Sequence, residues 1–298
     1  MLEKLTTETR NQNTMQLDAM TTKEILKVMN EEDQTISQAV NNEIDNIEQV
    51  VKAVIHSFNN GGRLIYVGAG TSGRLGILDA VECVPTFGVS KNLVVGFIAG
   101  GMEAFTVAVE GAEDSKELGK EDMKSIDLTE NDTVIGIAAS GRTPYVIGAL
   151  NYAKQQNATT AAISCNKNAE ISKHAELIIE VETGPEVLTG STRLKAGTAQ
   201  KLVLNMISTA SMIGIGKVYE NLMVDVKSTN EKLTERSKRI IMEATGVDGE
   251  TAASYYEQAQ HHVKTAIVMI LLQCSYNDAT DKLNETNGFV RESIKSAQ

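Results

Sequence analysis

Two short turns carry the residues whose types and spacing are best suited to bind an anion. The first turn, "GAGTSGR" (68–74), and the second turn, "AASGRTP" (138–144), each follow an apolar run and lead into a helical pattern. Small residues let backbone N–H groups and the positive end of a helix dipole point at one ligand. Hydroxyl donors come from Thr71, Ser72, Ser140 and Thr143. Either turn alone is more often plain helix capping, but the pair predicts a phosphate site.

Neither turn matches a common nucleotide-binding loop. The Walker pattern needs Lys before Ser or Thr after its second glycine, and both turns lack that lysine. "GAGTSG" nearly fits the G-x-G-x-x-G pattern, but no acid ends a second strand about 20 residues later to hold a ribose. Glu82 comes too early and falls within a predicted helix. A sugar phosphate is therefore favoured over a dinucleotide.

A carboxylate, Glu82, follows the first turn within "DAVECVPTFG" (79–88). Its nearest neighbours in the sequence are apolar, and an apolar setting favours the protonated form that a general acid needs. The commoner fate of a glutamate is a solvated helix surface, and that alternative stays open.

Short apolar runs that alternate with helical stretches predict the fold. Five of them suit buried parallel strands: "RLIYVGAG", "LVVGFIAG", "TVIGIAAS", "TTAAISC" and "ELIIEVE". The fold class is therefore α/β with a doubly wound parallel sheet, whose site is expected at the carboxyl ends of the strands.

Helical patterns flank this predicted sheet. Thr21 and Glu24 have capping-box spacing, and apolar positions from Ile36 to Phe58 fall on one helical face. After Lys217 the strand signals fade and a small helical domain is expected. We divide the chain into a helical N-terminal extension (1–53), an α/β domain (54–217) and a helical C-terminal domain (218–298).

Composition and charge argue against several classes of partner. The 298 residues have a net charge of −11 and no block of Lys or Arg, which disfavours nucleic acid and anionic membranes. The longest apolar run, near Thr265 to Cys274, is too short to span a bilayer, and the first residues show no signal core. Three widely spaced cysteines give no disulfide framework, and no metal-ligand spacing occurs. We expect a cytoplasmic protein without metal or cofactor.

Several segments resemble the bacterial N-acetylmuramic acid 6-phosphate etherases. "GPEVLTGSTRLKAGTAQK" (184–201) is similar to a signature that this family shares with the glucokinase regulatory protein, and both turns resemble the sugar isomerase domain. "DAVECVPTFG" and "VEGAEDS" (109–115) resemble the catalytic segments of the etherases. The resemblance covers nearly the whole chain. One departure is Val84, where the family pattern has a second proline.

The resemblance implies a lyase of cell-wall amino sugar recycling. It would cleave the D-lactyl ether at C3 of N-acetylmuramic acid 6-phosphate and add water, giving N-acetylglucosamine 6-phosphate and D-lactate. Glu82 would protonate the departing lactate, and Glu113 would remove the proton at C2. From the residues alone, Glu113 is not distinguished from Glu110. Substrate contacts are implied for Gly70, Thr71, Ser72, Ser140, Gly141, Thr143, Glu186, Ser191 and Lys195.

Two alternatives keep the phosphate turns but change the chemistry. An aldose–ketose phosphosugar isomerase shares proton abstraction at C2. A non-catalytic phosphosugar-sensing regulator needs the turns and the signature but not Glu82 and Glu113 together. One sugar isomerase domain, in a family whose sites lie at subunit interfaces, implies a homodimer, and the stripe from Ile36 to Phe58 either contributes to it or packs within its own subunit. Arg74 and Arg142 could reach a phosphate or the lactyl carboxylate, or lie solvated at a helix start. Arg193 of the signature could line the sugar site or pack against the sheet, and the sequence does not decide these roles.

Overall fold

The structure, a computed structural model, describes residues 5–107, 109–226 and 231–296 and divides into two compact units. The first unit comprises residues 1–81 and 91–208, and the second comprises residues 82–90 and 209–298. The three divisions expected from the sequence, with boundaries near residues 53 and 217, stay predictions.

Five parallel strands form the sheet of the first unit, and all five predicted strands are confirmed. They are β1 (Leu64–Gly68), β2 (Val94–Ile98), β3 (Thr133–Ala138), β4 (Thr159–Ser164) and β5 (Leu177–Glu180). Their spatial order is β2-β1-β3-β4-β5, so the chain reverses its direction of travel across the sheet between β1 and β3. Ligands of doubly wound sheets bind at such a switch point, and both predicted phosphate turns leave the sheet there.

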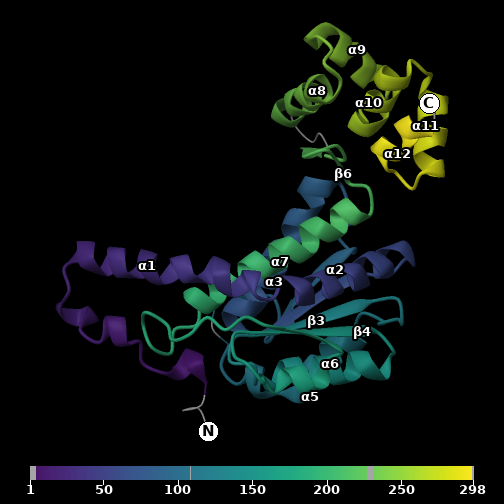
Figure 1. The fold of residues 1–298 in the computed structure, drawn as a ribbon. Coiled ribbons are helices and arrows are strands. Elements are labelled where there is room, and N and C mark those ends of the chain that lie inside the picture. Colours follow the sequence, from purple (N-terminus) through teal and green to yellow (C-terminus); the bar gives the residue numbers. More distant parts are fainter. Residues whose placement is uncertain (1–4, 108, 227–230, 297–298) are drawn as a thin grey trace. The chain divides into compact units, whose positions relative to one another are not determined.

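Helices cover both faces of the sheet, as Figure 1 shows. On one face α5 (Lys116–Lys124) packs against α6 (Pro144–Gln155). On the other lie α2 (Ile44–Asn59), α3 (Gly70–Phe87) and α7 (Lys195–Gly214). This double cover explains why the strands are apolar throughout rather than alternating.

A buried carboxylate joins β1, α3 and α7. Asp79 of α3 accepts hydrogen bonds from Tyr66 Oη of β1 at 2.9 Å, and from Asn205 Nδ2 and Ser208 Oγ of α7 at 2.8 and 3.0 Å. Asp79 is only 5% exposed, and its burial raises the pKa of the carboxyl above its ordinary range. The three donors compensate this burial and fix α3 against α7 beside the first turn.

The N-terminal helical stripe is interrupted, which corrects the expectation of one continuous apolar face. The capping box at Thr21 is confirmed and starts α1 (Thr22–Asn41), but the chain turns before α2 begins at Ile44. Glu43 at the turn is buried, where its carboxylate pairs with Lys167 and accepts the Glu180 N–H. These partners lie far along the sequence, so the stripe itself gave no sign of the break.

Shorter elements complete the first unit: η2 (Thr6–Glu8), η3 (Gln12–Thr14), η4 (Leu17–Ala19), α4 (Glu103–Thr106), η5 (Ala112–Asp114) and η6 (Ile171–His174). Two of them bear on the site, because α4 and η5 follow β2 and carry the segment that resembles a catalytic motif.

The second unit is mainly helical, as expected for the end of the chain. It holds a hairpin of β6 (Val218–Tyr219) and β7 (Leu222–Met223), followed by α8 (Glu231–Thr245), α9 (Gly249–Gln258), α10 (Val263–Leu272), α11 (Tyr276–Glu285) and α12 (Val290–Lys295). Tyr256 and Ile267 lie in its own hydrophobic core. Within the parts of the chain that the structure describes, no helix is long and apolar enough to cross a membrane.

Candidate active site

The first turn links β1 to α3. Gly70 opens the helix with a φ of +52°, and the first N–H to bond back within the turn is that of Gly73, to Ala69 O at 3.3 Å. The N–H groups before it point out of the helix start, where an anion is favoured. The Ser72 side chain is only 6% exposed and donates its hydroxyl to Gln200 Oε1 of α7 at 2.9 Å. Ser72 therefore already has a protein partner.

The second turn links β3 to α6 and is held by the backbone that follows β4. Gly141 has a φ of +71°, and a Cβ built there would lie 2.5 Å from Ala169 Cβ, so only glycine fits. Its carbonyl accepts the Ile171 N–H at 2.9 Å, and the carbonyl of Ala139 accepts the Cys165 N–H at 3.0 Å. Ser140 and Thr143 are half-buried, and Pro144 occupies the first turn of α6 as predicted.

A pocket of about 300 Å³ lies beside the first turn. One part of its wall is Gly70 with Arg74, and another is the segment after β2 with Glu110 and Glu113. Glu113 thus lines the same pocket as Gly70 of the first turn, although the two are far apart in the sequence. Glu110 lines the same pocket, so the geometry does not separate the two acids.

Arg74 fixes the segment that leads to these acids. Its guanidinium donates to Phe105 O at 2.8 Å and to Ala104 O at 2.7 Å, at the end of α4. This contact ties the helix of the first turn to the segment that precedes Glu110 and Glu113. Of the other arginines left open by the sequence, Arg142 is half-buried and Arg193 is exposed.

Glu82 lies on α3, exposed, with Val81 beside it 60% exposed. The apolar setting expected from its sequence neighbours is therefore not present within this chain. That the first turn and Glu82 act on the same substrate stays a prediction. Gly70 and Glu82 both belong to α3, and 12 residues of α helix rise about 18 Å, several times the span from C6 to C3 of a hexose.

Glu186 of the signature caps α7 in this structure. Its two carboxylate oxygens accept the N–H groups of Lys195 and Ala196 at 2.8 and 2.9 Å. The residue is fully buried, and burial raises the pKa of its carboxyl above the ordinary range. A carboxylate at a helix N-terminus is electrostatically favoured. Its implied role as a substrate contact stays a prediction, while the observed contacts give it a structural role.

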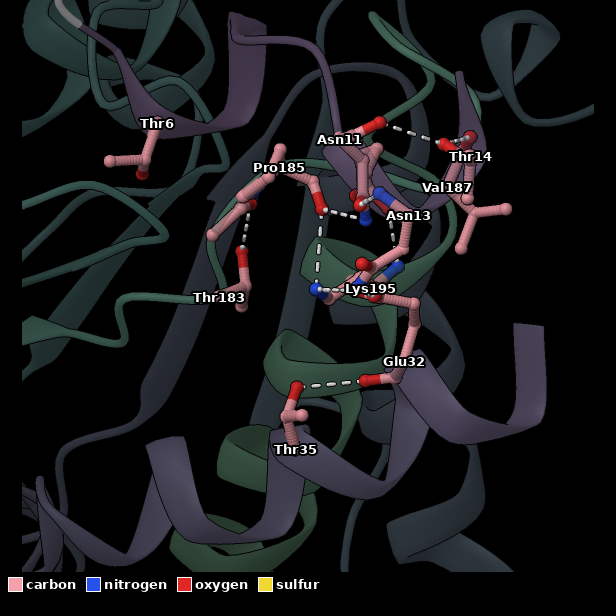
Figure 2. A network of polar contacts seen from close by, with 12 residues as sticks. Thr6, Asn11, Asn13, Thr14, Glu32, Thr35, Thr183, Pro185, Val187 and Lys195 are labelled. Carbon is pink, nitrogen blue, oxygen red and sulfur yellow. Dashed lines mark hydrogen bonds and ion pairs between the residues drawn. The ribbon is translucent and has the colours of Figure 1, made fainter. Parts of the chain in front are cut away.

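Lys195, at the start of the same helix, is engaged by the N-terminal part of the chain (Figure 2). Its Nζ donates to Glu32 Oε2 of α1 at 2.7 Å and to Pro185 O at 3.2 Å, and the residue is 3% exposed. Thr14 adds a bond to Val187 O at 2.9 Å. These bonds fasten the N-terminal segment to the signature loop, where Ser191 is half-buried.

The sequence interpretation missed Gln200 and the partners of Arg74. Gln200, which receives the Ser72 hydroxyl, lies in the signature, and its three-residue spacing from Gly197 places both on one face of α7. Arg74 was noted, but its partners are backbone carbonyls, which no side-chain pattern predicts.

Comparisons with known proteins identify the family. Residues 46–154 match the family model of the glucokinase regulatory protein N-terminal SIS domain, and residues 103–210 match that of the SIS domain. A Geobacillus sp. (strain WCH70) protein named N-acetylmuramic acid 6-phosphate etherase is 72% identical over 99% of this chain and 100% of its own length. A protein of that name from Bacillus cereus (strain AH187) is 70% identical over the same shares.

Among solved structures, a phosphoheptose isomerase from Francisella tularensis aligns with a TM-score of 0.51 at 14% identity, covering 65% of this chain and 100% of that chain. This likeness shows a shared fold alone. The similarity to the named etherases covers 99% of this chain. The chain belongs to the N-acetylmuramic acid 6-phosphate etherase family.

Proposed function

We propose that this protein cleaves the D-lactyl ether of N-acetylmuramic acid 6-phosphate and adds water, giving N-acetylglucosamine 6-phosphate and D-lactate. The observation that carries the proposal is the identity of 70 to 72% with named etherases along nearly the whole chain. The reaction belongs to the recycling of cell-wall amino sugars, which takes place in the cytoplasm. Cys83, Cys165 and Cys274 form no disulfide among the described residues, as that compartment favours.

The reaction requires one base and one acid. In the open-chain sugar the C2 proton lies next to the aldehyde, so a carboxylate can remove it. The electron pair forms a C2–C3 double bond as the C3–O bond breaks, and an acid protonates the lactate oxygen as it departs. Water then adds to C3 and C2 regains a proton. We assign the base to Glu113, which lines the pocket beside the first turn.

The 6-phosphate is assigned to the two turns. Both leave the sheet at its switch point between β1 and β3, and both supply helix-start N–H groups with hydroxyls. Ser72, Ser140 and Thr143 are the hydroxyl donors, with Gly70, Thr71 and Gly141 contributing backbone. Neutral donors suit a protein whose net charge is −11, because binding then depends on local geometry rather than on a broad positive field.

The acid is assigned to Glu82 of a second copy of the chain. Along α3, Glu82 lies about 18 Å beyond Gly70 of the first turn, and this separation favours a site that takes the turn from one chain and Glu82 from another. Leu78, one helical turn before Glu82, is 48% exposed, and the adjacent Val81 is 60% exposed. A partner subunit that covers these apolar side chains would give Glu82 its dry surroundings, and the protein would be a homodimer.

The direct test is to incubate the protein with N-acetylmuramic acid 6-phosphate and measure D-lactate enzymatically and the sugar product by mass spectrometry. We expect equal amounts of D-lactate and N-acetylglucosamine 6-phosphate, with one solvent oxygen at C3. Conversion to a ketose without lactate would indicate an isomerase instead. Tight binding without turnover would indicate a phosphosugar sensor.

A further inference from the structure

Gln200 is a buried amide whose hydrogen-bonding groups are only half used. The residue is 1% exposed, and its Oε1 accepts the Ser72 hydroxyl at 2.9 Å. Its Nε2 is also buried and has no hydrogen-bond partner among the described residues. Buried N–H donors are nearly always paired, so this one needs an explanation.

The surroundings place this amide directly behind the first turn. A Cβ built on Gly197, one helical turn before Gln200, would lie 3.4 Å from Thr71 Cγ2. The face of α7 that carries Gly197 and Gln200 therefore packs against Thr71 and Ser72. The buried network around Asp79, which bonds Asn205 and Ser208 farther along α7, holds the two helices at this spacing.

The observed orientation has a consequence for phosphate binding. A serine hydroxyl carries one hydrogen, and in the structure that hydrogen is donated to Gln200. Ser72 cannot donate the same hydrogen to a phosphate oxygen. A rotation of the Gln200 amide by 180° places Nε2 against Ser72 Oγ instead, so that the amide donates, the unpaired N–H gains its acceptor and the hydroxyl hydrogen is released.

We propose that Gln200 is a positioning residue that directs the Ser72 hydroxyl to the phosphate of the substrate by reversing its amide. This inference rests on the assignment of phosphate to the first turn under the proposed function. When phosphate arrives, Ser72 donates to it and accepts from Gln200 Nε2, and the two bonds strengthen one another as links in a chain. Gln200 itself does not touch the substrate.

The test is a double-mutant cycle with N-acetylglucosamine 6-phosphate as the probe and calorimetry as the readout. Gln200→Met keeps the side-chain length but neither donates nor accepts. We expect Gln200→Met and Ser72→Ala each to weaken binding on the order of tenfold, and the double variant to be no weaker than Ser72→Ala within about twofold. N-acetylglucosamine without phosphate should bind wild type and Gln200→Met equally.

Ser211→Ala is the matched control, because Ser211 is a buried hydroxyl on the same helix with no hydrogen-bond partner among the described residues. It should leave affinity for the probe unchanged. A loss from Gln200→Met that is equally large in the Ser72→Ala background would overturn the inference, since it would mark a general packing effect. Equal binding by wild type and Gln200→Met would also overturn it.

A measurement on the wild-type protein avoids any loss of folding in the variants. The side-chain amide signals of Gln200, assigned in ¹H–¹⁵N spectra by their disappearance in Gln200→Met or Gln200→Glu, should shift when N-acetylglucosamine 6-phosphate is added. They should not shift with N-acetylglucosamine. Unmoved signals at saturation would contradict the reversal. If the wild type does not bind the phosphosugar at all, the phosphate assignment fails, and this inference fails with it.

Discussion

The two phosphate turns are alike in sequence but are supported in different ways. The first turn is supported by two other helices, because Ser72 donates to Gln200 of α7 and Arg74 donates to the end of α4. The second turn is held through its own carbonyls, because Gly141 O accepts a backbone N–H and Ala139 O accepts a backbone N–H and the Asn166 side-chain amide. Its hydroxyls on Ser140 and Thr143 make no side-chain hydrogen bond that the described residues show. Similar local sequences thus give one turn that must exchange partners to bind and one already open to its ligand.

The largest expected effects come from substitutions of the two carboxylates, which leave both turns intact. Glu113→Ala should lower lactate release by about a hundred- to ten-thousandfold and abolish exchange of the C2 proton with deuterated water. Glu82→Ala should lose lactate release to a similar extent but keep the exchange, because proton removal precedes the acid's step. Deuterium in recovered substrate is measured by NMR beside a lactate assay.

Glu110→Ala is the control for this experiment, since Glu110 lines the same pocket. It should retain both activities. Exchange that is lost in Glu82→Ala and kept in Glu113→Ala would reverse the two assignments. Normal turnover in both Glu82→Ala and Glu113→Ala would mean that neither carboxylate takes part in the reaction.

Removing the 6-phosphate from the substrate tests both turns at once. N-acetylmuramic acid should show a kcat/KM lower than that of the phosphorylated substrate by a hundredfold or more, because each charge-assisted hydrogen bond contributes about 1.5 to 3 kcal/mol and several are lost together. Initial rates over a range of both substrates give the comparison. Similar values for the two would place the phosphate outside the turns.

Alanine at Gly70 of the first turn and at Gly141 of the second should lower the free energy of unfolding by different amounts. Gly141→Ala needs a left-handed φ and meets Ala169 Cβ at 2.5 Å, so it should cost about 3 kcal/mol of the free energy of unfolding. Gly70→Ala needs a left-handed φ but no atom lies within 4 Å, so about 1 kcal/mol is expected. Urea unfolding of both variants gives the difference. Equal costs would show that the second turn relaxes.

Removing a single hydroxyl should have a smaller effect on KM. Only the effect at the first turn should depend on Gln200 of α7. Ser140→Ala and Ser72→Ala should each raise KM on the order of tenfold. The effect of Ser140→Ala should be unchanged in a Gln200→Met background, whereas that of Ser72→Ala should largely disappear. Steady-state kinetics of the three single and two double variants measures this. Dependence of both serines on Gln200 would mean that the turns are not independently supported.

No effect is expected from metal removal. Both turns present N–H and hydroxyl donors, which suit an anion rather than a cation, and the proposed steps use carboxylates alone. Lactate release should be the same before and after dialysis against a chelator, without added nicotinamide or divalent ions. Activity that is lost and then restored by one particular metal would contradict this.

The sequence predicted the features that depend on residues close together in the chain. The strands, the capping box at Thr21 and the two turns follow from short-range apolar periodicity and turn chemistry, and the structure confirms the elements. The break at Glu43 and the capping by Glu186 depend on partners in other elements, so no local sequence pattern predicts them. Glu82 shows a further limit, because nearness in sequence to the first turn becomes distance once the intervening residues form a helix.

The central claim is that one substrate is held by the turns and the base of one chain and receives its proton from Glu82 of another. Mixing inactive Glu82→Ala and Glu113→Ala subunits, after dissociation and reassociation, tests it most directly. Half of randomly formed dimers are mixed and each has one complete site, so about a quarter of wild-type lactate release should return. The unmixed variants, treated in the same way, should stay inactive. If the mixture is as inactive as its parts although mixed dimers form, both carboxylates serve the site of their own chain and the account is wrong.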